Sequence, residues 1–174
     1  MRSSERHKRN AESDVKSYCA GVITVSDTRD KRTDRSGRLA CSLIKKAGGR
    51  VLRYRVIKDE VLEIRIALLE MLSDKGIQVI VLDGGTGISP KDVTPEAIEP
   101  FLDKRIDGFG ELFRSLSFDE IGTASMLSRA LAGVARNGVV VFALPGSPDA
   151  VRLAMEKIIL PELRHLVSLA KPER

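Results

Sequence analysis

The stretch Asp83-Gly84-Gly85-Thr86-Gly87 decides the fold, because it follows the apolar run 77–82 and precedes Lys91-Asp92-Val93-Thr94-Pro95-Glu96. The apolar run is short and rich in β-branched residues, which predicts a buried strand. Three glycines within four positions leave backbone N–H groups uncovered, and uncovered N–H groups can cradle phosphate oxygens. Thr94 and Pro95 predict a helix start, with Thr94 as N-cap and Pro95 at the first helical position. The segment therefore predicts an anion-binding turn, with Asp92 nearby as a candidate metal ligand.

Two common phosphate-binding motifs do not fit this turn. A P-loop requires a Gly-Lys-Ser/Thr ending, which is absent from this part of the sequence. A dinucleotide fingerprint requires a helix directly after the turn, and Ser89-Pro90 prevents that helix. Taken alone, the glycine turn is a weak signal, because glycine-rich turns after strands are more often plain connections between two elements. The residues around it therefore decide between the two interpretations.

Length and composition predict one main domain. With 174 residues, 43% of them hydrophobic, the chain can bury one sizeable core. We predict a flexible basic tail at residues 1–17 and a single domain at residues 18–174. No run approaches the roughly 18 apolar residues of a membrane span, and the N-terminus lacks the apolar segment of a signal peptide. We therefore expect a cytoplasmic protein with no membrane partner.

The charge balance favours anionic ligands. The net charge is +5 and the pI is near 9.4, with much of the excess in the N-terminal tail. Aromatic residues make up only 4% of the chain, and no nucleic-acid recognition motif is present. We therefore expect a small polyphosphate ligand and no nucleic acid, and keep nucleic-acid binding through the basic tail as a third alternative.

Strand-like and helix-like patterns alternate along the chain. Strands are predicted at 20–25, 51–57, 77–82, 133–136 and 139–144, and helices at 37–47, 61–72, 95–102, 110–117, 125–131 and from Pro148 onward. Asn137-Gly138 is a strong hairpin signal between the last two strands, and Pro161 predicts a kink in the last helix. This order predicts a three-layer α/β sandwich with a mostly parallel sheet plus one antiparallel strand from the hairpin.

Polar clusters follow the carboxyl ends of four predicted strands, where ligands bind in such sheets. The clusters are Ser26-Asp27, Lys58-Asp59-Glu60, the glycine turn and Pro145-Gly146-Ser147-Pro148. We expect them to meet at one rim. The carboxylates of Asp59 and Asp92 would repel a phosphate unless a cation lay between them. Mg²⁺ suits this position, because it takes one or two carboxylates together with substrate phosphates.

Several of these residues also have structural interpretations. Asp59 is equally suited to cap the helix at 61–72, and we favour Ser147 as a helix cap over a ligand contact. The pair Ser128-Arg129 is either a solvated helix face or an anion contact. Asp83 is expected to point away from the phosphate and to bond the turn. No plausible Ser-His-Asp or Cys-His set exists, which disfavours nucleophilic hydrolysis by such a set.

A series of short motifs occurs in a fixed order between residues 20 and 166. They are Val25-Ser26-Asp27-Thr28-Arg29, Asp34-Arg35-Ser36-Gly37, Asp59-Glu60, Gly84-Gly85-Thr86-Gly87, Lys91-Asp92-Val93-Thr94-Pro95-Glu96-Ala97, Gly108-Phe109-Gly110-Glu111, Ser128-Arg129 and Leu144-Pro145-Gly146-Ser147-Pro148. This ordered set resembles the MoaB/MogA family of molybdenum-cofactor biosynthesis, and more closely its MoaB branch. Asp83 departs from the pattern, because many members carry Thr or Ser there.

The resemblance implies a molybdopterin-binding fold and Mg²⁺-dependent transfer of AMP from ATP to the terminal phosphate of molybdopterin, with release of pyrophosphate. It places the essential, metal-binding aspartates at Asp59 and Asp92. Together with the rim clusters, it predicts a nucleotide and pterin pocket lined by Ser26, Asp27, Gly84, Gly85, Thr86, Gly87, Ser125, Ser128, Arg129, Pro145, Gly146 and Ser147.

The resemblance also bears on partners. Family members assemble as trimers or hexamers, so we expect a homo-trimer or homo-hexamer, and hand-over of the product to a molybdenum or tungsten insertase. The alternative to an active adenylyltransferase is a non-catalytic molybdopterin-binding protein that stores or delivers the cofactor, because branch membership alone does not prove catalysis.

Overall fold

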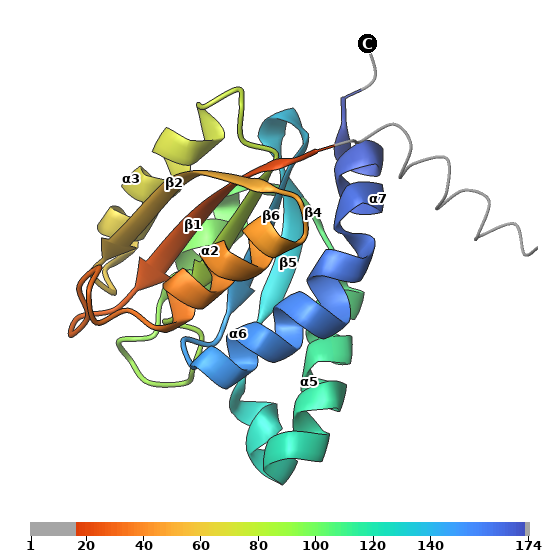
Figure 1. Ribbon diagram of the computed structural model, residues 1–174. Helices are drawn as coiled ribbons and strands as arrows, with labels where there is room; N and C mark the ends of the chain where they lie inside the picture. The colour runs from red at the N-terminus through yellow and green to blue at the C-terminus, as the bar shows by residue number, and fades with distance from the viewer. Residues whose placement is uncertain (1–16, 173–174) are drawn as a thin grey trace, which may run out of the picture.

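Six strands form one sheet in the order β2-β1-β3-β6-β5-β4 (Figure 1). The computed structural model describes residues 17–172, so the predicted tail lies outside the described residues except for Ser17. The strands are β1 (Cys19–Val25), β2 (Arg50–Ile57), β3 (Val79–Asp83), β4 (Leu102–Arg105), β5 (Leu131–Ala135) and β6 (Val139–Leu144). The strands β2, β1, β3 and β6 pair in parallel. Of the strands in residues 17–172, β5 alone runs in the opposite direction to the others, so its pairings with β4 and β6 are antiparallel.

Helices cover both faces of this sheet. They are α2 (Ser36–Lys46), α3 (Val61–Leu72), α4 (Thr94–Ile98), α5 (Asp107–Ile121), α6 (Pro148–Ala154) and α7 (Leu160–Ala170), with short segments η1 (Glu99–Phe101), η2 (Gly122–Leu127), η3 (Arg136–Gly138) and η4 (Met155–Ile159). Figure 1 shows α2 and α6 in front of the sheet, and these helices share one apolar core with α5 and α7. The second core contains α3 and α4. The predicted three-layer α/β sandwich is therefore confirmed.

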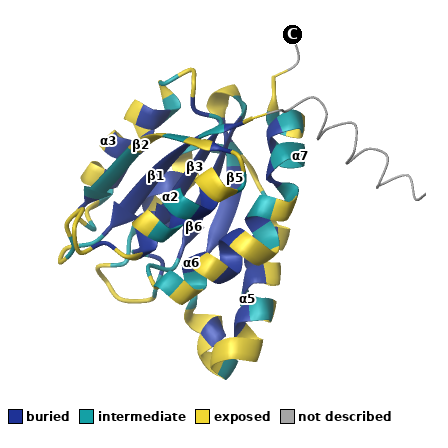
Figure 2. Ribbon diagram, in the orientation of Figure 1, coloured by how far each residue is buried: buried dark blue, intermediate teal, exposed yellow. Residues whose placement is uncertain are grey.

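The central strands are apolar because both of their faces are covered. Every residue of β3 and of β6 is buried, as the dark-blue strands in Figure 2 show. Side chains alternate between the two cores: Val79 and Val81 pack with α2, and Ile80 and Leu82 pack with α3. None of the helices in residues 17–172 is long and apolar enough to cross a membrane.

Three local predictions differ from the structure. The strand β4 was not predicted, because it is a charged edge strand in which three of four residues are exposed. The helix predicted at 110–117 extends over all of α5. The segment predicted as a helix at 125–131 instead ends its 3-10 turn at Leu127 and enters β5 at Leu131.

The hairpin and the interruption of the last helix both follow from single residues. Asn137 and Gly138 adopt φ of 67° and 74°, the left-handed conformation that a tight hairpin needs, and β5 pairs with β6 as predicted. We predicted a kink near Pro161, and the structure has a π-helical segment there, η4, which ends two residues before this proline. Because Pro161 has no N–H to donate to the preceding turn, the regular α-helical bonding cannot continue through it.

Candidate functional site

The glycine turn is held between the ends of β1 and β6. Gly84 and Gly85 have φ of +105° and +63°, and a side chain on Gly84 would lie 2.1 Å from the Val25 carbonyl oxygen. The Gly84 N–H donates to the Leu144 carbonyl at 2.9 Å. Only glycine fits this close approach of three backbone segments. The turn is therefore a rigid connection whose shape is fixed by its neighbours.

Thr94 fixes the other side of the turn. Its N–H donates to the Gly85 carbonyl at 3.0 Å, and its hydroxyl donates to the Gly84 carbonyl at 2.9 Å. The prediction that Thr94 caps α4 is wrong: Val93 is the N-cap residue, Thr94 begins the helix and Pro95 is its second residue. The hydroxyl that could have capped the helix holds the turn instead.

Asp59 lies against the turn at Gly85. A Cβ atom on Gly85 would lie 2.7 and 2.8 Å from the two carboxylate oxygens of Asp59. The alternative interpretation of Asp59 as the cap of α3 does not hold, because Glu60 is the N-cap residue and no side chain in residues 17–172 caps that helix. The Asp59 carboxylate instead accepts a long hydrogen bond of 3.4 Å from the Val93 N–H. It is therefore available to a ligand at the turn.

Asp92 lies against the same turn at Gly87. A Cβ atom on Gly87 would lie 2.7 Å from Asp92 Oδ2. That oxygen accepts from the Ser89 N–H at 2.9 Å, and the Asp92 N–H donates back to the Ser89 carbonyl at 2.9 Å. The two carboxylates are thus brought together beside residues 85 and 87 of one loop, in the arrangement that the order of the strands predicts.

The electrostatics of Asp59 reflect its burial and its acidic neighbours. Burial raises the pKa of Asp59, and the nearby carboxylates of Asp92 and Asp27 raise it further against the opposing effects of the Val93 N–H and Arg129. Among residues 17–172, no three His, Cys, Asp or Glu side chains are grouped as a metal site. A pair of carboxylates could hold Mg²⁺, which takes one or two carboxylates together with waters and phosphates, more readily than a metal that needs a full set of protein ligands.

The segment after β1 joins the loop that carries Asp59. Asp27 Oδ1 accepts from the Asp59 N–H at 3.2 Å, and the Ser26 N–H donates to the Ile57 carbonyl at 2.8 Å. Lys91 Nζ lies 3.8 Å from Asp27 Oδ2, and the Lys91 side chain is 82% exposed. Ser26 and Asp27 therefore lie beside the predicted metal ligands, with an exposed cationic group nearby.

The loop after β6 closes the rim. A Cβ atom on Gly146 would lie 3.1 Å from the Gly84 Cα atom. Arg29 Nη1 donates to the Gly146 carbonyl and to Ser36 Oγ, both at 2.9 Å. Ser147 Oγ accepts from the Ala150 N–H at 3.1 Å, so its predicted role as the cap of α6 is confirmed. Arg29 was not predicted as a site residue, although it lies within the first motif.

A cavity of about 330 Å³ opens beside the turn, between the end of α5, η2 and the start of α6. Six of the predicted pocket residues line it: Thr86, Gly87, Ser125, Ser128, Pro145 and Ser147. Its other walls include apolar side chains such as Phe113 and Leu153. The remaining predicted residues belong to the turn and to the loops next to it. The cavity therefore combines apolar walls with polar groups from the turn and from η2.

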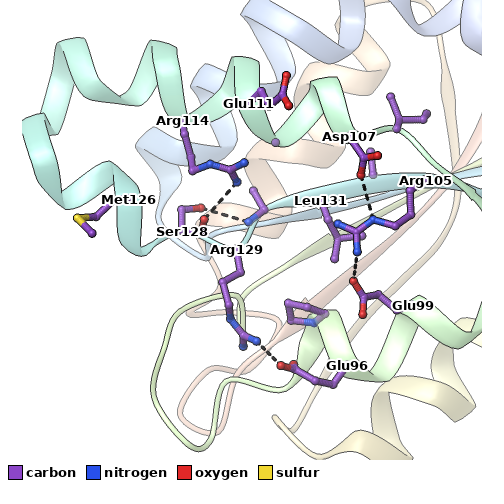
Figure 3. A pocket seen from close by; sticks show the side chains of 15 residues that line it. Glu96, Glu99, Arg105, Asp107, Glu111, Arg114, Met126, Ser128, Arg129 and Leu131 are labelled. Carbon is purple, nitrogen blue, oxygen red and sulfur yellow. Dashed lines mark hydrogen bonds and ion pairs between the residues drawn. The ribbon is translucent and has the colours of Figure 1, made fainter.

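A second, more charged cavity of about 550 Å³ lies between α4, β4 and α5 (Figure 3). Ser128 lines both cavities, and Arg129 lies in the wall of the charged one. Neither residue lies on a helix, since η2 ends at Leu127. Figure 3 shows the Arg129 side chain directed toward Glu96.

Asp83 points away from the phosphate cradle, as predicted. It does not bond the turn, which corrects the second part of that prediction. Its carboxyl group is fully buried and lies 2.5 Å from Ser36 Oγ and 2.9 Å from Thr24 Oγ1. Burial raises the pKa of Asp83 to about 7, against the opposing hydrogen bonds of Ser36 and Thr24. The aspartate at position 83, where many members of the family carry Thr or Ser, is therefore buried beneath the turn.

Known proteins are similar to this chain in sequence and fold. Residues 21–165 match a family described as a probable molybdopterin binding domain. A Bacillus cereus protein named molybdenum cofactor biosynthesis protein B is 47% identical over 161 residues, 92% of this chain and 93% of the relative. A Bacillus subtilis protein of the same name is 46% identical over 166 residues, covering 95% of each chain.

Solved structures of proteins with similar names have the same fold. A crystal structure of a molybdenum cofactor biosynthesis protein B superposes with a TM-score of 0.85 at 46% identity, covering 88% of this chain and 96% of that one. A tungsten cofactor synthesizing protein, MoaB from Pyrococcus furiosus, gives a TM-score of 0.82 at 41% identity, with 91% and 99% covered. Sequence, fold and the arrangement of the motifs agree, and the chain belongs to the MoaB/MogA family of molybdopterin-binding-domain proteins.

Proposed function

We propose that this protein acts in molybdenum-cofactor biosynthesis by transferring AMP from ATP to the terminal phosphate of molybdopterin. The single observation that carries the proposal is the position of Asp59 and Asp92 against Gly85 and Gly87 of one turn. The names of the relatives support the pathway. The adenylyl-transfer step rests on the chemistry of the site.

Different residues would bind the two substrates. The Gly84 N–H already donates to the Leu144 carbonyl, so the N–H groups of residues 85–87 and the Lys91 side chain would bind the phosphates of ATP, since N–H groups and a cation both suit an oxyanion. The cavity lined by Phe113 and Ser125 would hold the pterin, whose ring has an apolar face and a polar edge. Gly87 lines that cavity and also adjoins Asp92, so it would lie where the two substrates meet.

The reaction needs positioning more than it needs a proton acceptor. A phosphate oxygen of molybdopterin, already ionised at neutral pH, attacks the α-phosphorus of ATP. The bond from that phosphorus to the bridging oxygen breaks, and pyrophosphate leaves with its electron pair. Mg²⁺ held by Asp59 and Asp92 would reduce the repulsion between the two anions and stabilise the leaving group. The chain's own task is to keep both carboxylates and the phosphates in line.

The proposal is tested with purified protein, molybdopterin, ATP and Mg²⁺. Wild-type protein should form adenylylated molybdopterin and pyrophosphate in equal amounts. Asp59→Asn and Asp92→Asn should each lower turnover by roughly 100-fold or more, while Asp103→Asn on the exposed edge of β4 should keep wild-type turnover. Molybdopterin binding without any ATP-dependent product would overturn the proposal in favour of a storage or delivery protein.

A further inference from the structure

Arg129 has an unusual position at the site. Its backbone N–H donates to the Thr86 carbonyl at 2.9 Å. Its side chain donates from Nε to the Gly87 carbonyl at 2.7 Å and from Nη2 to the Asp92 carbonyl at 2.6 Å. The third guanidinium nitrogen, Nη1, pairs with Glu96 in the first turn of α4. All three guanidinium nitrogens are thus bonded to protein acceptors, and Figure 3 shows the pair with Glu96.

These bonds span the loop that carries Asp92. Residues 88–91 are exposed, and the Ile88 side chain is 68% accessible to solvent. The carbonyls of Gly87 and Asp92 lie at the two ends of this exposed segment, and both accept from the same planar guanidinium group. The fixed fork of the guanidinium therefore sets the separation between the glycine turn and Asp92.

We propose that Arg129 is a positioning residue that locks Asp92 against the glycine turn, with Glu96 holding the guanidinium in place. This inference rests on the proposed function for its catalytic consequence. It differs from the prediction that Arg129 binds the substrate, because the side chain already donates to two carbonyls and an acid of the protein. Arg129 therefore acts on the reaction indirectly, through the position of Asp92.

Glu96 separates the positioning role from direct phosphate binding. If Arg129 bound phosphate, removing the Glu96 charge would free the guanidinium and strengthen ATP binding. If Arg129 positions the loop, Glu96→Gln loosens the guanidinium and weakens catalysis in the same direction as a change at Arg129. A lysine at position 129 has a single nitrogen and cannot hold three acceptors in this arrangement. Arg129→Lys should therefore rescue only part of the loss.

The variants to compare are Arg129→Gln, Arg129→Lys and Glu96→Gln. Arg105→Gln is the matched control, because Arg105 lines the same charged cavity and pairs with Glu99 and Asp107 without contacting the loop. Arg129→Gln should lower kcat roughly 100-fold, the loss expected when a reacting group is displaced by about 1 Å. It should raise the Mg²⁺ concentration at half-maximal rate and change KM for ATP little. Glu96→Gln should follow the same pattern more weakly, and the control should match wild type.

A second measurement does not depend on turnover. Hydrogen–deuterium exchange of residues 88–93 in the protein without substrates should become faster in Arg129→Gln and Glu96→Gln, and stay at the wild-type rate in Arg105→Gln. Wild-type exchange in Arg129→Gln, or a selective rise of KM for ATP with unchanged kcat, would overturn the positioning role while the proposed function stood. If wild-type protein formed no product, the proposed function would fail, and the exchange rates would still decide the role of Arg129.

Discussion

Asp34 and Asp83 share one hydroxyl group beneath the glycine turn: Thr24 Oγ1 lies 2.6 Å from Asp34 Oδ2 and 2.9 Å from Asp83 Oδ2. Ser36 Oγ bridges the same two carboxyl groups at 3.1 and 2.5 Å. Each hydroxyl has one proton and can donate to only one carboxyl group at a time. A proton on Asp83 completes this buried network, because a neutral Asp83 can donate to Ser36 or Thr24.

The first prediction concerns the pH dependence of stability. Asp83 has its pKa raised to about 7, so it keeps its proton in the folded protein at pH values where the unfolded chain has lost it. The stability that this proton contributes is complete below about pH 4, the pKa of an aspartate in the unfolded chain. It is lost as the pH rises through about 7, the pKa of Asp83 in the folded protein. Asp34, whose burial is outweighed by hydrogen bonds from Thr24, Tyr54, Gly37 and Ser36, has a lowered pKa. The ionised Asp34 carboxylate therefore contributes stability at neutral pH, and this contribution is lost only as the pH falls through its lowered pKa.

Urea denaturation between pH 5 and 7.5 isolates the effect of Asp83, because groups common to wild type and Asp83→Asn cancel in the difference. Wild type should lose roughly 2–3 kcal/mol of unfolding free energy relative to the variant across this range. The side-chain amide of the variant cannot titrate, so the stability curve of the variant lacks this component. Parallel stability curves for the two proteins would show that Asp83 is not protonated in the fold.

The second prediction concerns Gly87, where a methyl group would meet Asp92 Oδ2 at 2.7 Å. Gly87→Ala should displace the carboxylate and lower turnover roughly 100-fold, with little change in the melting temperature. Gly108→Ala is the matched control, because nothing lies within 4 Å of its Cβ position. Steady-state turnover and thermal melting of both variants check this expectation. Full activity in Gly87→Ala would mean that the position of Asp92 does not matter.

The third prediction separates the two roles of Ser147, which caps α6 and also lines the cavity. Ser147→Ala should lower stability by about 1 kcal/mol through loss of the cap. Ser147→Asp should keep the cap and the stability, but its charge should weaken molybdopterin binding. Ser115→Ala on the exposed face of α5 serves as a control in denaturation and binding measurements. Equal molybdopterin affinity for Ser147→Asp and wild type would place the pterin outside this cavity.

The fourth prediction is a homo-oligomer, a trimer or a hexamer. On α3, Leu62, Ile66 and Leu69 are 68%, 44% and 46% exposed and lie on one face of the helix. An apolar stripe of this kind favours contact with another copy of the chain. Light scattering should give a mass of three or six chains, and Leu62→Glu with Ile66→Glu should reduce it. A monomeric wild-type protein would contradict the prediction.

The layers of the fold could be predicted because the central strands are continuous apolar runs between strong helix patterns. The edge strand β4 could not, since Asp103, Lys104 and Arg105 make no apolar pattern and the strand depends on pairing with β5. The prediction for residues 125–131 failed because short 3-10 turns share helix-like spacing. Local sequence also could not show that Pro161 would be preceded by a π-helical segment.

The meeting of Asp59 and Asp92 could be predicted from topology, because both follow strands whose carboxyl ends share a rim. Their hydrogen-bond partners could not. The cap position assigned to Thr94 was wrong, and the cap left open as an alternative for Asp59 does not form, because both side chains lie against the glycine turn in the folded chain. The contacts of Arg29 and Arg129 depend on carbonyls far away in sequence, and no local motif encodes such contacts.

The most direct test of the central claim is calorimetric titration of ATP with and without Mg²⁺ into wild type, Asp59→Asn, Asp92→Asn and the double variant. If both carboxylates hold one cation beside the phosphates, each single variant should lose the Mg²⁺-dependent part of ATP affinity, and the double variant should lose little more. Losses that simply add, or ATP affinity that does not respond to Mg²⁺ in wild type, would contradict a shared cation site at the glycine turn.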